Sequence, residues 1–139
     1  MNIKRTILVV SLVFLSGCAA QKLMHQPQEY TEQLKSKEVI ERVLYYQSPN
    51  HAIRSVYIRP DYIRIISTAR NRTTYIHFEY INKFELHVKD EWRIVTLRGP
   101  FNDVIYRLYL KDEQMARDFI NAVYTLKVHQ NDDVHPSEQ

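Results

Sequence analysis

Cysteine and glycine are both scarce in this sequence, with one Cys and two Gly among 139 residues. A single cysteine excludes a fold held by disulfide bonds within the chain and a zinc site built from several cysteines. So little glycine excludes a collagen-like chain, a glycine-rich linker and a glycine-rich loop that cradles phosphate. The length is that of one ordinary domain, so we expect one hydrophobic core.

A strong excess of positive charge is also absent. The chain has 19 Lys and Arg against 16 Asp and Glu, a net charge of +3. Lys4 and Arg5 lie in an N-terminal segment that we expect to be removed, which leaves 17 basic residues against 16 acidic ones. We therefore predict that the mature chain is nearly neutral and does not bind nucleic acid.

Residues 1–17 have the pattern of a secretory signal peptide. A short basic head is followed by an apolar run over 7–14, which is too short to span a bilayer as a lasting helix, and then by small residues. The sequence Leu15-Ser16-Gly17-Cys18 closely resembles the lipobox of bacterial lipoproteins. The resemblance implies that Cys18 becomes the N-terminal residue and carries lipid. It also implies the periplasmic face of the outer membrane, because Ala19 stands where an Asp would favour the inner membrane. The alternatives are an ordinary signal peptide with an incidental cysteine, or an uncleaved anchor.

Beyond the signal peptide, the pattern predicts a linker, one domain and a tail. Residues 18–30 contain a proline and show no clear period, which is typical of a spacer. From residue 31 on, apolar side chains recur at helical spacing and predict an amphipathic helix with Leu34, Val39, Ile40, Val43 and Leu44 on its apolar side. We place a single domain at 31–127 and a flexible tail at 128–139.

Between residues 53 and 110 the apolar period changes to two, which predicts strands. Six runs are separated by short turns: 53–59, 62–69, 75–80, 84–88, 92–98 and 104–110. In the third run we expect Ile76, Phe78 and Tyr80 to share one face. Asp112 is then a predicted N-cap for a C-terminal helix with the apolar stripe Met115, Phe119, Ala122, Val123 and Leu126. The predicted fold class is α+β: a bent antiparallel sheet or partly open barrel of about six or seven strands, with an N-terminal amphipathic helix and a C-terminal helix.

This order of elements resembles that of pleckstrin-homology-like domains, in particular their GRAM-like members. The resemblance covers Val56 to Lys127 and rests on three stretches: Tyr62-Ile63-Arg64-Ile65-Ile66, Tyr75-Ile76-His77-Phe78-Glu79-Tyr80-Ile81 leading into Lys83-Phe84-Glu85-Leu86, and Leu108-Tyr109-Leu110-Lys111-Asp112. It is a match of pattern and order, so it implies the fold and no ligand.

Five arginines in and around the first hairpin are candidates for an anion site: Arg54, Arg59, Arg64, Arg70 and Arg72. Such a strip attracts lipid phosphates, lipopolysaccharide or an acidic partner. Arg59 lies at one turn and Arg70 and Arg72 at the other, separated by a strand of about 25 Å, so the five cannot form one tight pocket. The alternative is a set of solvated charges that protects a sheet edge.

Catalytic and metal-binding patterns are weak. His77 and His87, with Glu79 and Glu85 nearby in sequence, could bind zinc only under a particular strand pairing, and exposed strand positions are the simpler interpretation. No serine lies in a Gly-x-Ser-x-Gly motif, no acid and base are paired, and lipidation consumes the only thiol. We predict that the protein is not an enzyme and holds no metal and no cofactor.

Tyrosine, in contrast, is abundant, with ten residues. Most are expected to pack in the core or at its rim, because aromatic side chains suit strands. Tyr75 and Tyr109 are candidates for an interface, since tyrosine combines a large area with a polar hydroxyl. We predict a lipoprotein anchored in the membrane through lipid on Cys18, which acts as a non-enzymatic scaffold or accessory factor and binds another envelope protein. The alternative is a lipoprotein that binds a lipid or a glycan between helix and sheet.

Overall fold

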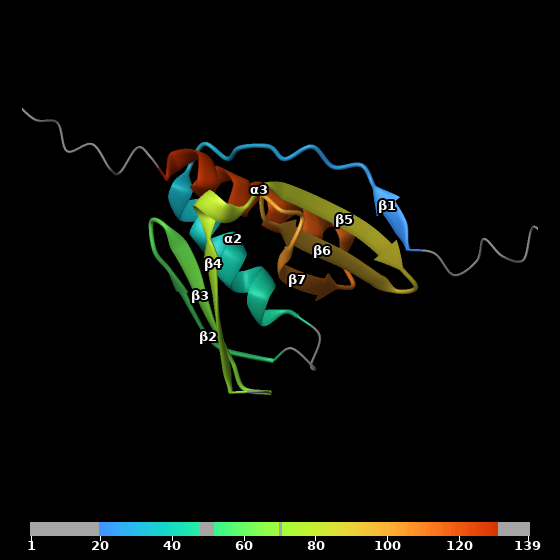
Figure 1. Cartoon of the computed structure of the whole chain (residues 1–139), viewed down its shortest axis with the longest axis horizontal. Helices are drawn as coiled ribbons and strands as arrows, with labels where there is room; N and C mark the ends of the chain where they lie inside the picture. The colour runs from blue at the N-terminus through green and yellow to red at the C-terminus, as the bar shows by residue number, and fades with distance from the viewer. Residues whose placement is uncertain (1–19, 48–51, 70, 131–139) are drawn as a thin grey trace, which may run out of the picture.

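Two antiparallel sheets and two helices make up the fold (Figure 1). The structure is a computed structural model that describes residues 20–47, 52–69 and 71–130. Sheet A has the strand order β1 (Gln21–Leu23), β5 (Lys83–Lys89), β6 (Trp92–Arg98), β7 (Val104–Leu110). Sheet B has the order β2 (Ile53–Ile58), β3 (Tyr62–Ser67), β4 (Arg72–His77). The helices are α2 (Gln33–Tyr45), α3 (Glu113–His129) and a single 3-10 turn, η3 (Phe78–Tyr80), which follows β4.

The predicted antiparallel strands and the two helices are confirmed. Asp112 is the N-cap of α3, where its Oδ1 accepts a hydrogen bond from the Met115 N–H at 2.8 Å. The strands divide between two sheets, and the described residues form no closed barrel. The division falls after β4, because the chain leaves sheet B through η3 and returns to sheet A, to which β1 also belongs, at Lys83.

The prediction that residues 75–80 form one strand is wrong for residues 78–80. Strand β4 stops at His77, and the Phe78 N–H donates to the Asp61 carbonyl at 3.0 Å. The Lys127 ammonium donates to the Phe78 carbonyl at 3.1 Å, which joins this turn to α3. Phe78 is fully buried while Tyr80 is 55% exposed, so these two side chains do not share a face.

The core lies where α2 and α3 pack against each other and against the inner faces of both sheets. The predicted apolar stripes supply most of the helix contribution: Val39, Ile40, Val43, Leu44, Phe119, Ala122, Val123 and Leu126 are all buried. Leu34 is an exception to the prediction, since 67% of it is exposed on the first turn of α2. From the sheets, buried residues alternate along the strands, as in Ile63 and Ile65 of β3.

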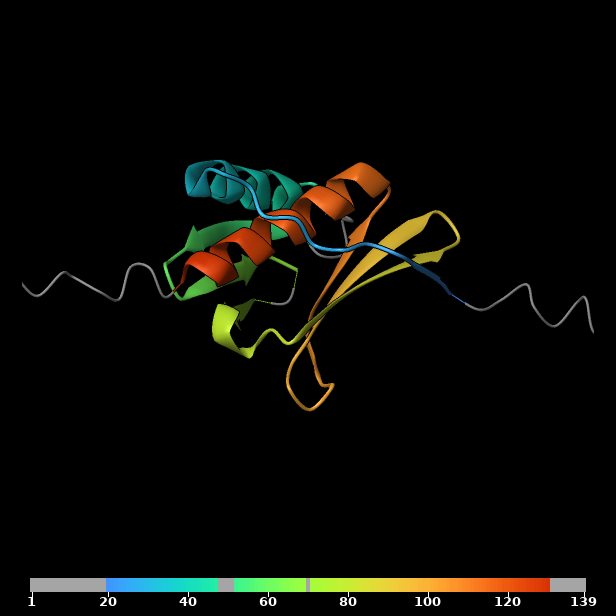
Figure 2. The same cartoon turned by 90° about the horizontal axis from the view of Figure 1, so that it is seen from above.

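Residues 20–30, which we call the strap, are packed against the domain (Figures 1 and 2). Strand β1 at its start pairs with β5, with Gln21 opposite Val88 and Leu23 opposite Leu86. The rest of the strap runs along α3. The sequence predicts a linker over 18–30. The described part of this segment, residues 20–30, instead makes specific contacts with the domain.

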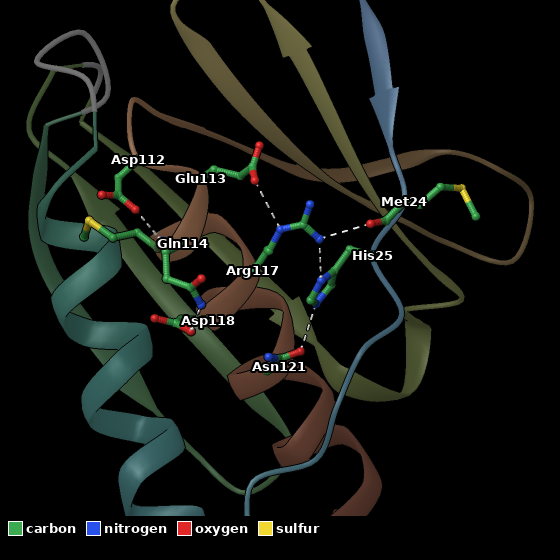
Figure 3. Close-up of polar contacts among 9 residues, drawn as sticks. Met24, His25, Asp112, Glu113, Gln114, Arg117, Asp118 and Asn121 are labelled. Carbon is green, nitrogen blue, oxygen red and sulfur yellow. Dashed lines mark hydrogen bonds and ion pairs between the residues drawn. The ribbon is translucent and has the colours of Figure 1, made fainter.

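Two buried polar residues of α3 hold the strap. Asn121 accepts a hydrogen bond through Oδ1 from the Gln28 N–H at 2.9 Å, and the Thr125 hydroxyl accepts one from the Tyr30 N–H at 2.8 Å. Figure 3 shows the neighbouring contacts, in which Arg117 donates to the Met24 carbonyl at 3.0 Å and to His25 Nδ1 at 2.9 Å. Because arginine can only donate, His25 carries its proton on Nε2 and donates it to Asn121 at 2.9 Å.

Candidate functional site

The outer face of sheet B carries a set of aromatic side chains around one arginine. The buried residues Val56, Ile63, Ile65 and Ile76 point from this sheet to the core, on the side where α2 contacts β2. Because side chains alternate across a strand, their neighbours point outward. We call this outward set the aromatic–arginine face: Tyr57, Tyr62, Arg64, Tyr75 and His77, joined by Tyr80 from η3.

Strand register places these residues side by side. Tyr57, Arg64 and Tyr75 lie directly opposite one another across the three strands, and Tyr62 lies opposite His77 in the next row. The ring of Tyr62 is 5.6 Å from that of Tyr75 and 5.5 Å from that of His77, measured between centroids. The His77 ring is in turn 5.8 Å from that of Tyr80. The rings of Tyr62, Tyr75, His77 and Tyr80 therefore form one connected cluster on the outer face of sheet B.

The cluster is open to solvent at its margins. Tyr57 is 41% exposed, Tyr75 is 50% exposed and Tyr80 is 55% exposed. Tyr62, Arg64 and His77 are half-buried between them. The face therefore has a half-buried centre and a more exposed rim.

Arg64 at the centre has unused hydrogen-bonding capacity. Its guanidinium carbon lies 4.3 Å from the centroid of the Tyr57 ring, a cation–π contact. Its Nε is covered from solvent and has no hydrogen-bond partner. Within the described residues no carboxylate forms an ion pair with Arg64.

The five predicted arginines do not form one site. Arg64 alone lies in the aromatic–arginine face, while Arg54 is exposed on β2 and Arg59 is exposed just after β2. Arg72 begins β4 and lines a cleft between the sheets. Arg70 lies outside the described residues, and so does Cys18.

The two predicted interface tyrosines lie on different sheets. Tyr75 is part of the aromatic–arginine face, whereas Tyr109 is on β7 and lines the same cleft as Arg72. This cleft has a volume of about 310 Å³ and is open to solvent. Its polar lining includes Arg72, Arg107, Ser67 and Thr74, and its apolar lining includes Ile53, Ile65 and Val104.

The histidines considered for zinc are also on different sheets, His77 on β4 and His87 on β5. In the part of the chain that the structure describes, no group of three or more His, Cys, Asp or Glu side chains is placed to hold a metal ion. Glu79 is exposed, whereas Glu85 is buried among Lys83, Arg98 and His87 on the outer face of sheet A.

Glu85 is a buried carboxylate that stays ionised. Burial alone would raise its pKa, but the hydrogen bonds from Lys83 and Arg98 outweigh burial and hold the pKa below its ordinary value. The Arg98 Nε donates to Oε1 at 3.0 Å and the Lys83 ammonium lies 3.2 Å from the same oxygen. A carboxylate satisfied in this way anchors neighbouring strands and is a poor proton donor.

Four members of the aromatic–arginine face were not predicted as interface residues from the sequence: Tyr57, Tyr62, Tyr80 and His77, of which His77 was considered only as a possible zinc ligand. A signal was present, because strand alternation puts Tyr62 and Arg64 on one face of their strand and Tyr75 and His77 on one face of theirs. What alternation leaves open is which residues lie opposite each other, and the hairpin register decides this.

Comparison of the chain with protein-family models, with curated proteins and with solved structures finds no match. No helix among the described residues is long and apolar enough to cross a membrane. The geometry of the chain itself therefore carries the functional argument.

Proposed function

We propose that the protein is a lipoprotein of the outer membrane, anchored on the periplasmic face through Cys18, and that its domain is a non-enzymatic scaffold or accessory factor that binds another envelope protein. The observation that carries the proposal is the aromatic–arginine face. Tyrosine and arginine are the residue types enriched at the energetic centres of protein interfaces. Here they are gathered on one sheet surface with three tyrosines more than 40% exposed.

A non-enzymatic role is favoured by the state of Glu85, Asn121 and Thr125, three of the five buried polar residues in the described part of the chain. Glu85 is paired with cations, and Asn121 and Thr125 hold the strap. These groups are occupied by contacts within the fold, and none is a free acid or base in a cleft.

The alternative, a lipid or glycan ligand between helix and sheet, has less support. Ile40, Leu44 and Phe119 are fully buried where the helices meet the sheets. A ligand of this class would have to use the cleft between the two sheets, or a pocket of about 300 Å³ where the end of α2 and the start of α3 meet sheet A, which is lined by Tyr46, Gln47, Trp92, Leu110, Lys111, Asp112 and Met115.

The proposal includes a pleckstrin-homology-like fold for the domain. Its support is the succession of β2 to β7 in two antiparallel sheets, with α3 following the last strand and closing the core. In this assignment the strap, which contains β1, and helix α2 precede the part of the chain that resembles a pleckstrin-homology-like domain.

Replacing Cys18 with Ser tests the anchor. We expect the C18S protein to appear in the soluble fraction after cell breakage, whereas the Ser16→Thr protein, a control that leaves Cys18 in place, stays with the outer membrane. Firm retention of the C18S protein in membranes would contradict lipid anchoring.

Photo-crosslinking in intact cells tests the scaffold role. A photoreactive residue at Tyr75 or Tyr80 should crosslink to one protein in near-stoichiometric yield, and the same residue at Tyr45, exposed on α2, should not. Equal yields from both surfaces, or crosslinks to lipid or glycan alone, would contradict protein binding by this face.

A further inference from the structure

We infer that the partner recognised by the aromatic–arginine face is an acidic protein segment, with a carboxylate paired to Arg64 and apolar neighbours packed on the surrounding rings. This inference rests on the proposed scaffold function and adds the chemistry of the partner. Its support is the charge of sheet B, the absence of an ion-pair partner for Arg64 among the described residues, and the position of the face in the molecule.

The charge of sheet B is of one sign. Strands β2, β3 and β4 contain Arg54, Arg64 and Arg72 and no Asp or Glu. Over residues 53–80, five arginines stand against Asp61 and Glu79, which leaves a net charge of +3. Only Arg64 of these five lies in the aromatic–arginine face, and the six residues that define the face include no Asp or Glu, so the face itself presents a positive charge that complements a negative partner.

Arg64 is prepared to accept a carboxylate. The Tyr57 ring packs on its guanidinium and limits its motion, so less conformational freedom is lost when a partner binds. Its Nε is covered from solvent and has no hydrogen-bond partner, so a carboxylate that approaches from outside meets the two terminal NH₂ groups, to which no carboxylate among the described residues is paired. A guanidinium binds a carboxylate through two parallel N–H bonds, which gives geometric specificity as well as affinity.

The rings define what flanks the carboxylate. Tyr75 lies opposite Arg64 on one side and Tyr57 on the other, and Tyr62 is its outward neighbour toward one end of β3, so a partner side chain beside the carboxylate meets an aromatic ring on these three sides. An acidic segment that also carries apolar or aromatic residues fits this surface better than a purely acidic one.

The position of the face favours a protein over the anchoring membrane. The described chain begins at Ala20, directly before β1, and Cys18 precedes Ala20 by two residues in the sequence. Figures 1 and 2 both show β1 and sheet B at opposite ends of the molecule. An anchor next to β1 therefore places sheet B at the end remote from the lipid, where it meets periplasmic proteins.

Binding of synthetic polymers to the full-length acylated protein in detergent tests the inference. The probes are a random copolymer of glutamate and tyrosine, a random copolymer of lysine and tyrosine, and vesicles of phosphatidylcholine with phosphatidylglycerol. We expect saturable binding of the glutamate copolymer, at least tenfold weaker binding of the lysine copolymer, and weakening by added salt. Binding in detergent does not require that the protein be anchored in a membrane. A failure to bind the glutamate copolymer would therefore leave the lipid anchor untouched, which the C18S experiment tests on its own.

Three variants locate the binding. Arg64→Gln should weaken binding of the glutamate copolymer at least tenfold, and Arg64→Lys should weaken it less because the charge remains without the paired N–H geometry. Arg107→Gln removes an exposed arginine of sheet A and should change affinity less than threefold. Thermal unfolding of each variant reports whether the fold is intact. Absence of binding, equal loss in R64Q and R107Q, or R64-dependent binding to the anionic vesicles without binding to the copolymer would overturn the inference.

Discussion

Glu85 shows how one buried charge is made tolerable in a small domain. Its side chain is only 9% exposed, and burial of a carboxylate is costly unless it is paired. Lys83 on the same strand and Arg98 on β6 supply the pairing. The contact with Arg98 also joins β5 to β6 near the first residue of β5. The outcome is a carboxylate whose pKa is lowered although it is buried.

Glu85→Gln should reduce the free energy of unfolding at pH 7 by about 2 kcal/mol, the typical loss for hydrogen bonds to charged groups. Because the pKa of Glu85 is lower in the folded chain, its ionised form stabilises the fold at pH values above its unfolded pKa of about 4.3. This stabilisation is lost as the pH falls through the folded pKa. Urea unfolding of both proteins at pH 7, 5 and 3 should therefore show a difference that shrinks toward acid.

Glu79→Gln is the matched control, since Glu79 is exposed in η3. Its unfolding free energy should follow that of the unsubstituted protein within about 0.5 kcal/mol at every pH. A difference between Glu85→Gln and the unsubstituted protein that stays constant from pH 7 to pH 3 would contradict the role of the ionised carboxylate.

Among the elements, the strap is the one that depends most on contacts distant in sequence. Its hydrogen bonds join residues 25–30 to residues 121 and 125 of α3, more than 90 positions away. His129 at the end of α3 also contacts Glu29. The segment has only one short strand of its own, so its position is determined by α3 and not by local preference.

Asn121→Ala should release the strap from α3 while leaving the core in place. The variant removes the acceptor of both the Gln28 N–H and the His25 ring N–H, each of which then needs water. We expect hydrogen exchange of the Gln28 amide to rise at least about tenfold, because local opening requires less free energy. Exchange of amides in β6 should not change.

Gln114→Ala is the control for this experiment, since Gln114 is exposed on the first turn of the same helix. It should leave Gln28 exchange as it is in the unsubstituted protein. If Asn121→Ala accelerates exchange equally in the strap and in β6, the substitution has destabilised the whole fold and the strap has no separate opening.

The difference between local and distant determinants explains what the sequence could predict. Asp112 and the stripe around Phe119 are local signals, and the N-cap, the helix and its buried face were all predictable. The end of β4 was not predictable, because the backbone of Phe78 forms hydrogen bonds with Asp61 and Lys127, which are far from it in sequence. The same holds for the candidate site. The exposure of Tyr75 is predictable from the alternation of side chains along its strand, but its place opposite Arg64 depends on the register between strands, which the sequence alone does not give.

At the scale of the whole molecule, the contacts of the strap shorten the free chain between the proposed anchor and the domain. A free linker of 13 residues would let the domain move about 20 Å from its anchor in any orientation. With residues 20–30 held on β5 and α3, the described chain instead begins near the end of sheet A where β5 turns into β6. Gln21 lies opposite Val88, close to this turn, which has Asp90 at its tip, so we expect the proposed lipid anchor to be attached at this end of the domain.

Site-directed labels can measure this orientation, because the chain has no cysteine other than Cys18, which is acylated in the proposed mature form. A fluorophore on Asp90→Cys should be strongly quenched by a quencher attached to lipid headgroups. The same label on Asp61→Cys, in the turn between β2 and β3 at the opposite end of the molecule (Figures 1 and 2), should be quenched several-fold less. Adding Asn121→Ala should reduce the contrast, since a released strap lets the domain reorient. Equal quenching at the two positions with the strap intact would mean that the domain has no fixed orientation, and the aromatic–arginine face would then be as accessible to lipid as to protein.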